Sequence, residues 1–203
     1  MNVKSPYILK KLFPGLIWEI VTPKKEVFLT FDDGPHPEVT PWILKCLDDY
    51  DAKATFFCVG ENVCKYPDIY NTIINKGHMV GNHSYNHLSG WKTTNYEYFE
   101  NIEKAGELIE SRLFRPPYGR ITPSQIKILK HDFRIIMWSI LTYDYDVMVS
   151  KEQCLKNSIK STKSGSIVVF HDSAKSYKNL YYTLPLFLEH FTKLGFRFNP
   201  MQY

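Results

Sequence analysis

The 203-residue sequence lacks several patterns that would assign it to a familiar class. No apolar run approaches the roughly 18 residues needed to span a bilayer, so we expect no stable insertion into a membrane. None of the four cysteines forms a Cys-x-x-Cys pair, which argues against a zinc knuckle and favours free thiols in a reducing compartment. No repeat, low-complexity stretch or linker is visible, and these absences exclude collagen-like and other compositionally biased architectures.

An excess of charge of one sign is also missing. Lys and Arg number 25 against 21 Asp and Glu, which gives a net charge of +4. A nucleic-acid-binding protein usually gathers its basic residues in a stripe, whereas here they are scattered among acidic residues. We therefore predict no nucleic-acid partner.

The N-terminal residues 1–24 do not resemble a secretory signal, because Lys10, Lys11 and Pro14 interrupt the apolar stretches and a small-residue cleavage site is absent. We expect this segment to pack as an extension on the rest of the protein and the protein to be cytoplasmic. Contact of the basic and aromatic segment with a membrane surface is the alternative, which would make the protein peripheral.

The composition that is present fits an ordinary globular protein. Hydrophobic residues make up 44% and charged residues 23%, and the length predicts one domain over residues 1–203. Aromatic residues reach 15%. Because Tyr and Trp combine an apolar ring with a polar group, this surplus fits a groove for a ligand such as a sugar, or simply an aromatic core. The sequence leaves the oligomeric state unknown.

Short apolar strands alternate with amphipathic helices along the chain. Strands are predicted at 26–31, 54–59, 79–81, 113–114, 134–141, 166–170 and 195–199, and helices at 39–50, 66–76, 95–111, 123–130, 151–161 and 183–194. This alternation predicts βαβ units and a mainly parallel sheet. About seven strands without a Gly-x-Gly-x-x-Gly turn favour a distorted or incomplete (β/α) barrel over a doubly wound sheet.

Ionisable residues follow four of these predicted strands. Asp32 and Asp33 end the first, His83 and His87 follow the third, and the motifs starting at Arg115 and His171 follow two others. In a barrel, the loops after the carboxyl ends of the strands carry the chemistry, so these groups should meet at one rim. Taken singly, each motif also fits a turn, a solvated Arg or a structural His.

Two imidazoles four residues apart, His83 and His87, lie on one face if the segment forms a helical turn, and can then chelate one metal ion. Asp33 would supply a third protein ligand, which is the number that a catalytic zinc site uses while leaving a position for water. The sequence thus indicates a candidate Zn²⁺ site.

Four segments together resemble the polysaccharide deacetylases, the NodB homology domain of carbohydrate esterase family four. They are Thr-Phe-Asp-Asp-Gly-Pro at 30–35, His-Ser-Tyr-Asn-His at 83–87, Arg-Pro-Pro-Tyr-Gly at 115–119 and Val-Phe-His at 169–171. They stand in the order of the family's motifs and extend over most of the chain.

The resemblance implies a distorted barrel and a divalent metal, usually Zn²⁺ or else another transition metal. It implies hydrolysis of N-acetyl groups on an amino-sugar polymer or oligomer, an N-acetylated glycan, with a metal-bound water as nucleophile. By position, the resemblance implies that the metal ligands are Asp33, His83 and His87. It implies Asp32 as general base, His171 as general acid and Arg115 as the group that orients Asp32. The implied substrate-binding residues are Pro117, Tyr118, Tyr145 and Val169, and the backbone N–H of Tyr118 would help to stabilise the oxyanion.

The segment at 138–146 departs from the family pattern. Leu141 stands where we expect the Asp that pairs with the catalytic histidine, and Tyr145 stands where the family has Trp. A carboxylate partner raises the pKa of an imidazole and an apolar neighbour lowers it. His171 would therefore have a lower pKa, or would pair with Asp144, Asp146 or Asp172 instead.

Two other functions stay open, the first of them because of Leu141. One is a carbohydrate-binding protein of the same fold with weakened catalysis. The other is a hydrolase of the same fold that acts on another amide or on an ester.

Overall fold

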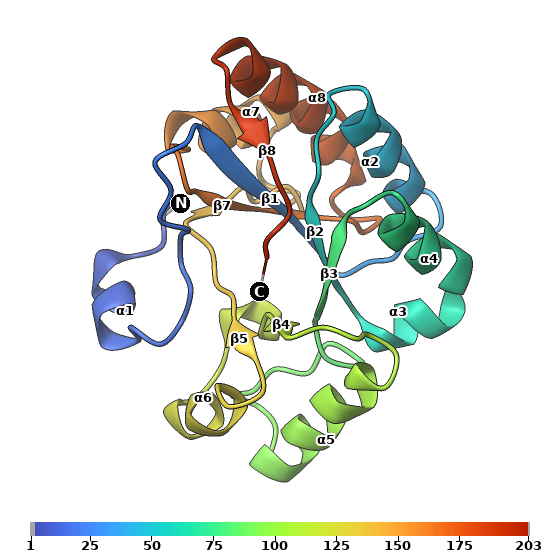
Figure 1. Ribbon diagram of the computed structural model, residues 1–203, viewed down its shortest axis with the longest axis vertical. Coiled ribbons are helices and arrows are strands. Elements are labelled where there is room, and N and C mark those ends of the chain that lie inside the picture. The colour runs from blue at the N-terminus through green and yellow to red at the C-terminus, as the bar shows by residue number, and fades with distance from the viewer. Residues whose placement is uncertain (1–2, 203) are drawn as a thin grey trace.

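The computed structural model describes residues 3–202 and contains a curled, parallel sheet surrounded by helices (Figure 1). The strands are β1 (Glu26–Asp32), β2 (Thr55–Cys58), β3 (Met79–Asn82), β4 (Leu113–Phe114), β5 (Arg134–Ile135), β6 (Ile140–Leu141), β7 (Ile167–His171) and β8 (Arg197–Phe198). Their order is β5-β4-β3-β2-β1-β7-β6, with β8 pairing β1. Each of these pairings is parallel, which confirms the predicted incomplete, mainly parallel barrel.

The helices lie on the outside of the sheet (Figure 1). They are α1 (Tyr7–Leu12), α2 (Val39–Asp48), α3 (Gly60–Lys65), α4 (Pro67–Asn75), α5 (Asn95–Gly106), the 3₁₀ turn η1 (Pro117–Gly119), α6 (Pro123–Leu129), α7 (Lys151–Lys160) and α8 (Tyr177–Lys193). Capping boxes begin two of them, formed by Thr94 with Glu97 and by Thr122 with Gln125. The sequence did not predict α1 or α3, and α8 begins six residues before the predicted start at Thr183.

The single strand predicted at 134–141 is wrong, because this segment splits into β5 and β6 at opposite edges of the sheet. Within the interruption, the Arg115 side chain donates to the carbonyl oxygens of Ile136 (Nε, 3.3 Å) and Met137 (Nη2, 3.0 Å), and Ile17 pairs with the same backbone. Five residue steps separate Ile135 from Ile140, a span of at most roughly 18 Å. The two edges must therefore lie close together, as they do in a nearly closed barrel.

The strands are buried because helices cover them, as expected for a parallel sheet. In β1, the residues from Val27 to Asp32 are all buried. Phe31 stacks against Phe56 of β2 and Phe170 of β7, with ring centroids 5.0 and 6.0 Å apart. This aromatic stack fixes the three strands that carry or adjoin the candidate site.

The N-terminal segment lies along the gap between the sheet edges, beside β5 and α6 (Figure 1). Lys4 forms an isolated bridge with Ile140, Ile17 with Ile136, and Glu19 with Ser166. Residues 1 and 2 of the extension predicted at 1–24 lie outside the described residues. The assignment of the whole chain to one domain stays a prediction.

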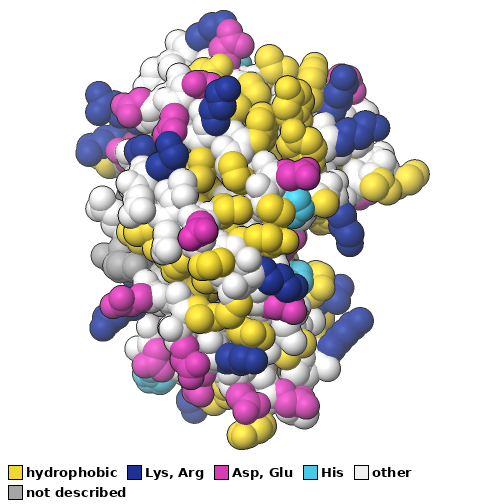
Figure 2. Space-filling model, turned by 90° about the vertical axis from the view of Figure 1, so that its right-hand side faces the viewer, with side chains coloured by type: hydrophobic (Ala, Val, Ile, Leu, Met, Phe, Trp, Pro, Cys, Tyr) yellow, Lys and Arg dark blue, Asp and Glu magenta, His cyan; other side chains and the backbone are white. Residues whose placement is uncertain are grey.

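Lys and Arg side chains are interspersed with Asp and Glu over the face drawn in Figure 2. The four cysteines are free thiols, as predicted. Within residues 3–202, the helices are all too short or too polar to cross a bilayer.

Candidate active site

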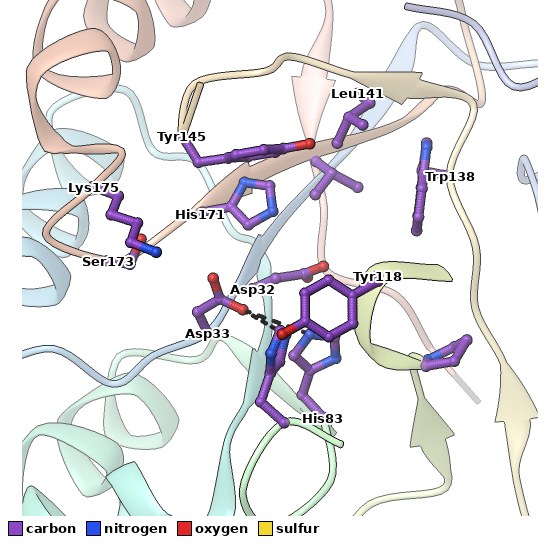
Figure 3. A pocket seen from close by; sticks show the side chains of 13 residues that line it. Asp32, Asp33, His83, Tyr118, Trp138, Leu141, Tyr145, His171, Ser173 and Lys175 are labelled. Carbon is purple, nitrogen blue, oxygen red and sulfur yellow. Dashed lines mark ion pairs between the residues drawn. The ribbon is translucent and has the colours of Figure 1, made fainter. Parts of the chain in front are cut away.

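The predicted site residues converge at the carboxyl ends of β1, β3, β4 and β7, around a cavity of about 300 Å³ (Figure 3). The cavity is lined by Asp32, Asp33, His83, His87, Pro116, Tyr118, Trp138, Leu141, Tyr145, Val169, His171, Ser173 and Lys175. The rim predicted from the strand ends is therefore present as a single cavity.

Three side chains on one side of this cavity form a candidate metal centre. Each side chain offers one ligand atom, and the three atoms all lie within 4.8 Å of one another; the residues are Asp33, His83 and His87. The Oδ1 atom of Asp33 is 3.7 Å from Nε2 of His83 and 3.2 Å from Nε2 of His87 (Figure 3). Burial alone would raise the pKa of Asp33, but its hydrogen bond with His87 and the charges of His171 and His83 hold that pKa below its usual value.

His83 is fixed by the backbone of the next motif. Its Nδ1 lies 2.7 Å from the carbonyl oxygen of Arg115, so Nδ1 carries the proton and the lone pair of Nε2 faces Asp33. The side chain is buried, and this burial lowers the pKa of His83 to about 4, because the charged form loses its hydration. A neutral imidazole with a free Nε2 is the form that binds a metal ion.

The helical turn predicted for 83–87 is wrong. The segment is a loop in which Ser84 and His87 both have a φ of 62°. Asn82 holds its start, since the Asn82 side chain accepts from the Ser84 N–H (2.8 Å) and donates to the Ile102 carbonyl (2.9 Å). The two imidazoles meet, with ring centroids 5.0 Å apart, through this loop rather than through helical spacing.

Asp32 is paired with Arg115, as predicted from the motifs. The guanidinium donates from Nη1 to Oδ1 of Asp32 (2.6 Å) and to the hydroxyl of Thr30 (2.7 Å), and both charged side chains are buried. The guanidinium also lies 4.1 Å from the ring centroid of Phe57. Because every side of the guanidinium is occupied, its position determines the direction of the Asp32 carboxylate.

His171 is paired with Asp144, one of the three carboxylates predicted as alternatives, and the predicted lower pKa is wrong. Nδ1 of His171 lies 2.8 Å from Oδ1 of Asp144, and Oδ2 accepts the backbone N–H of His171 (2.8 Å). Burial alone would lower the pKa of His171, but the charge and hydrogen bond of Asp144 raise it to about 9. Leu141 instead pairs with Val169 across β6 and β7 and lines the cavity. The remaining two alternatives, Asp146 and Asp172, serve other contacts.

Asp172 supports the turn beneath the candidate metal centre. Its carboxyl group accepts the N–H of Gly34 (2.8 Å) and the hydroxyl of Thr40 (2.7 Å). A Cβ at Gly34 would lie 1.8 Å from the Asp172 carboxyl, so this close contact requires glycine next to Asp33. Burial raises the pKa of Asp172 well above its usual value.

Three of the four predicted substrate-binding residues line the cavity, namely Tyr118, Tyr145 and Val169. Pro117 is buried in η1 and is not among the lining residues of the described chain, where Pro116 lies instead. Trp138, Ser173 and Lys175 also line the cavity. Sequence reasoning did not select these three, although Trp138 and Ser173 each stand beside a motif that it did select.

Several cavity residues have backbone angles that are unusual for residues other than glycine. Asp33 (φ 84°), His87 (φ 62°) and Tyr118 (φ 60°) are all in the left-handed region. Such residues cost about 1–3 kcal/mol each, and they collect at functional sites because the surrounding structure holds them. All three residues line the cavity, so the unusual backbone angles coincide with the candidate site.

This arrangement can hold a cation at the candidate metal centre. It also places a proton acceptor, Asp32, and a proton donor, His171, in the same cavity. A carboxylate oriented by a guanidinium can accept a proton, and an imidazole whose pKa is near 9 carries one at neutral pH. Figure 3 shows His171 and Tyr145 on one side of the cavity, Asp33 and His83 on the other, and Asp32 between them.

Comparisons with known proteins agree on one family. The sequence model for polysaccharide deacetylases matches residues 19–132. A peptidoglycan-N-acetylglucosamine deacetylase of Bacillus cereus is 40% identical over 157 residues, which are 74% of this chain and 57% of that protein. A chitooligosaccharide deacetylase of Azorhizobium caulinodans is 30% identical over 166 residues, covering 78% of this chain and 79% of that protein.

A solved structure resembles nearly the whole chain. It is the Bc1960 peptidoglycan N-acetylglucosamine deacetylase in complex with 4-naphthalen-1-yl-N-oxidanyl-benzamide, with a TM-score of 0.89 and 32% identity. The match covers 97% of this chain and 95% of that one.

Proposed function

The chain belongs to the polysaccharide deacetylase family, and on that premise we propose that it is a metal-dependent hydrolase that removes N-acetyl groups from an amino-sugar polymer or oligomer. The names of its relatives, which act on peptidoglycan and chitooligosaccharides, support this substrate class. The observation that carries the proposal is the joint placement of a cation site, an oriented carboxylate and a protonated imidazole around one cavity.

The donor set at Asp33, His83 and His87 fits a divalent metal ion. Two imidazole nitrogens and a carboxylate oxygen are ligands that Zn²⁺ takes, and three protein ligands are typical of a catalytic site. When bound there, the ion would polarise the acetamide carbonyl and make water more acidic. The hydrogen bond from His83 Nδ1 to the Arg115 carbonyl provides the partner that ligating histidines usually have.

Asp32 would act as the general base. Its carboxylate lies in the cavity beside Asp33, and Arg115 holds it in one orientation at 2.6 Å. A water that attacks the acetamide carbon loses a proton to Asp32 as the new C–O bond forms. The buried guanidinium holds one carboxylate oxygen, Oδ1, by a charge-assisted hydrogen bond, which leaves Oδ2 to receive the proton.

His171 would act as the general acid. It comes from β7 at the position paired with Asp32 in β1, so the acid and the base are neighbours across one parallel pair of strands. Its Nδ1 is engaged by Asp144, which leaves Nε2 for the substrate. Nε2 would protonate the departing amine as the C–N bond breaks and acetate is released.

The acetyl methyl group would contact the apolar wall formed by Leu141, Tyr145 and Val169. Tyr145 packs edge-on against His171, with ring centroids 4.6 Å apart, so it also limits the position of the acid. The N–H of Tyr118 would donate to the developing oxyanion, a contact whose loss costs about 10²–10³ in rate.

Acetate release tests the proposal directly. The purified protein with added Zn²⁺ should release acetate from N-acetylglucosamine oligomers. Asp32→Asn should lose turnover and keep its bound zinc, while Asp33→Asn should lose both, as measured by metal analysis of the dialysed protein. Binding of metal and sugar without any acetate would favour the carbohydrate-binding alternative. Faster turnover of acetylated xylan or of acyclic amides would favour the hydrolase of another substrate.

A further inference from the structure

A second cavity of about 390 Å³ lies beside the candidate active site, between the N-terminal segment and the loops after β4 and β5. We call it the apolar groove. It is lined by Lys4, Ser5, Pro6, Leu9, Phe13, Leu16, Trp18, Trp91, Tyr118, Gly119, Ile121, Ile126, Met137, Trp138, Leu141 and Tyr143. Apart from Lys4, Ser5 and Gly119, the lining residues are hydrophobic, in contrast to the ionisable residues of the cavity next to it.

The apolar groove adjoins the active-site cavity directly. Tyr118, Trp138 and Leu141 line both spaces. Figure 3 shows Tyr118 and Trp138 along one side of the active-site cavity, where the two spaces meet. Tyr118 is 61% exposed, so a substituent that leaves the active site over this ring enters the groove without displacing a buried side chain.

Three polar groups of the groove wall are used inside the protein. The indole N–H of Trp18 donates to the Phe13 carbonyl (3.3 Å), and that of Trp91 donates to the Ile121 carbonyl (3.2 Å). The Ser5 hydroxyl donates to the Trp138 carbonyl. The wall thus presents ring faces and aliphatic groups, which favours a hydrocarbon occupant over a hydroxyl-rich sugar.

A positively charged side chain, that of Arg120, lies beside Tyr118, which lines both cavities, and beside Trp91, which lines the groove. The guanidinium of Arg120 lies 5.7 Å from the ring centroid of Tyr118 and 5.6 Å from that of Trp91. No carboxylate in residues 3–202 forms an ion pair with Arg120, so its charge is available to an anion. The order along the surface is therefore a site for an amino sugar, a cation and an apolar groove.

We propose that this order recognises a lipid-linked amino sugar, in which a phosphate joins the sugar to a hydrocarbon chain carried by the substrate itself. The N-acetyl group would lie in the active site, the phosphate at Arg120 and the hydrocarbon in the apolar groove. This inference rests on the proposed function for its chemistry and adds the substrate class.

Turnover of a graded series of substrates tests the proposal. The substrates are the methyl, hexyl and decyl glycosides of N-acetylglucosamine. From methyl to hexyl, kcat/KM should rise at least tenfold. Each methylene group that the groove buries can raise kcat/KM by roughly fourfold at most. A decyl phosphodiester of the same sugar should gain about tenfold more through Arg120. Leu9→Gln should reduce the gain with chain length, and Arg120→Gln should remove the gain from phosphate.

Leu12→Gln is the matched control, because Leu12 lies on the same helix as Leu9, is 64% exposed and does not line the groove. Equal gains in the Leu9 and Leu12 variants would overturn the proposal. It would also be overturned if longer N-acetylglucosamine oligomers or longer N-acyl groups, rather than longer alkyl aglycones, raised kcat/KM.

Binding without turnover separates this inference from the proposed function. Three of the four tryptophans, Trp18, Trp91 and Trp138, line the groove, so an occupant should change the intrinsic fluorescence. Decyl phosphate should produce a saturable change that Leu9→Gln weakens and Leu12→Gln does not. This change would support the groove even if no substrate released acetate. A flat titration would overturn the inference and leave acetate release as the separate test of the activity.

Discussion

Replacing Asp144 with Asn should move the pH range in which the protein is active. Asp144 holds the pKa of His171 at about 9, against a usual value of 6.5, while burial acts in the opposite direction. Without the charge and hydrogen bond of Asp144, the pKa of His171 should fall toward its usual value of 6.5, with only the charges of Asp33 and Asp32 left to oppose the effect of burial. A fall to that value corresponds to roughly 3 kcal/mol of lost stabilisation of the imidazolium.

The effect on rate follows from the fraction of His171 that carries a proton. At pH 8, that fraction is about 0.9 for a pKa near 9 and about 0.03 for a pKa of 6.5, which gives a decrease of about 30-fold in kcat. At pH 6, kcat of the wild-type protein and kcat of the Asp144→Asn variant should differ far less. The alkaline limb of the kcat profile should therefore shift to lower pH by two units or more.

Acetate release measured from pH 5 to pH 10 checks this shift. Asp146→Asn is the matched control, since Asp146 lies two residues away and accepts the Met148 N–H (2.9 Å) rather than contacting His171. Circular dichroism should show that both variants are folded. An unchanged alkaline limb in Asp144→Asn would refute the assignment of His171 as the proton donor.

Three other changes should have separate outcomes. Arg115→Met leaves the buried Asp32 carboxylate unpaired, so urea unfolding should show a loss of about 3–5 kcal/mol, and a loss below 1 kcal/mol would contradict the importance of this pair. Asp172→Ala leaves the Gly34 N–H and the Thr40 hydroxyl unpaired and should cost about 1–3 kcal/mol per group, measured in the same way; unchanged stability would argue against this support of the turn. Chelation with EDTA should abolish acetate release and added Zn²⁺ should restore it, and zinc at 100 times its Kd should stabilise the fold by about 2.7 kcal/mol in thermal unfolding, an effect that His87→Ala should lose.

The sequence was sufficient to predict the barrel and the strand ends that meet at its rim. Each strand is a short apolar run bounded by turn residues, and parallel strands bring their carboxyl ends to one edge. The helices with capping residues, such as α6 after Thr122, were also placed well. The short helix α1 buries none of its side chains, so no apolar periodicity marked it.

The sequence could not predict the interruption between β5 and β6. There, the Arg115 side chain and Ile17, both distant in the sequence, bind the backbone at 135–137. The partner of His171 was ambiguous for a similar reason. Leu141, Asp144 and Asp146 lie within six residues, and only the path of the loop decides that Asp144 reaches the ring.

The contacts of Arg115 also limit how this protein could be altered. One guanidinium orients the Asp32 carboxylate and binds the backbone that joins the two margins of the sheet. Selection for the reaction therefore also maintains the nearly closed barrel, since a change at this residue damages both together. Efforts to broaden substrate range should keep it and vary Trp138 and Leu141, which border both cavities without joining the sheet margins through their side chains.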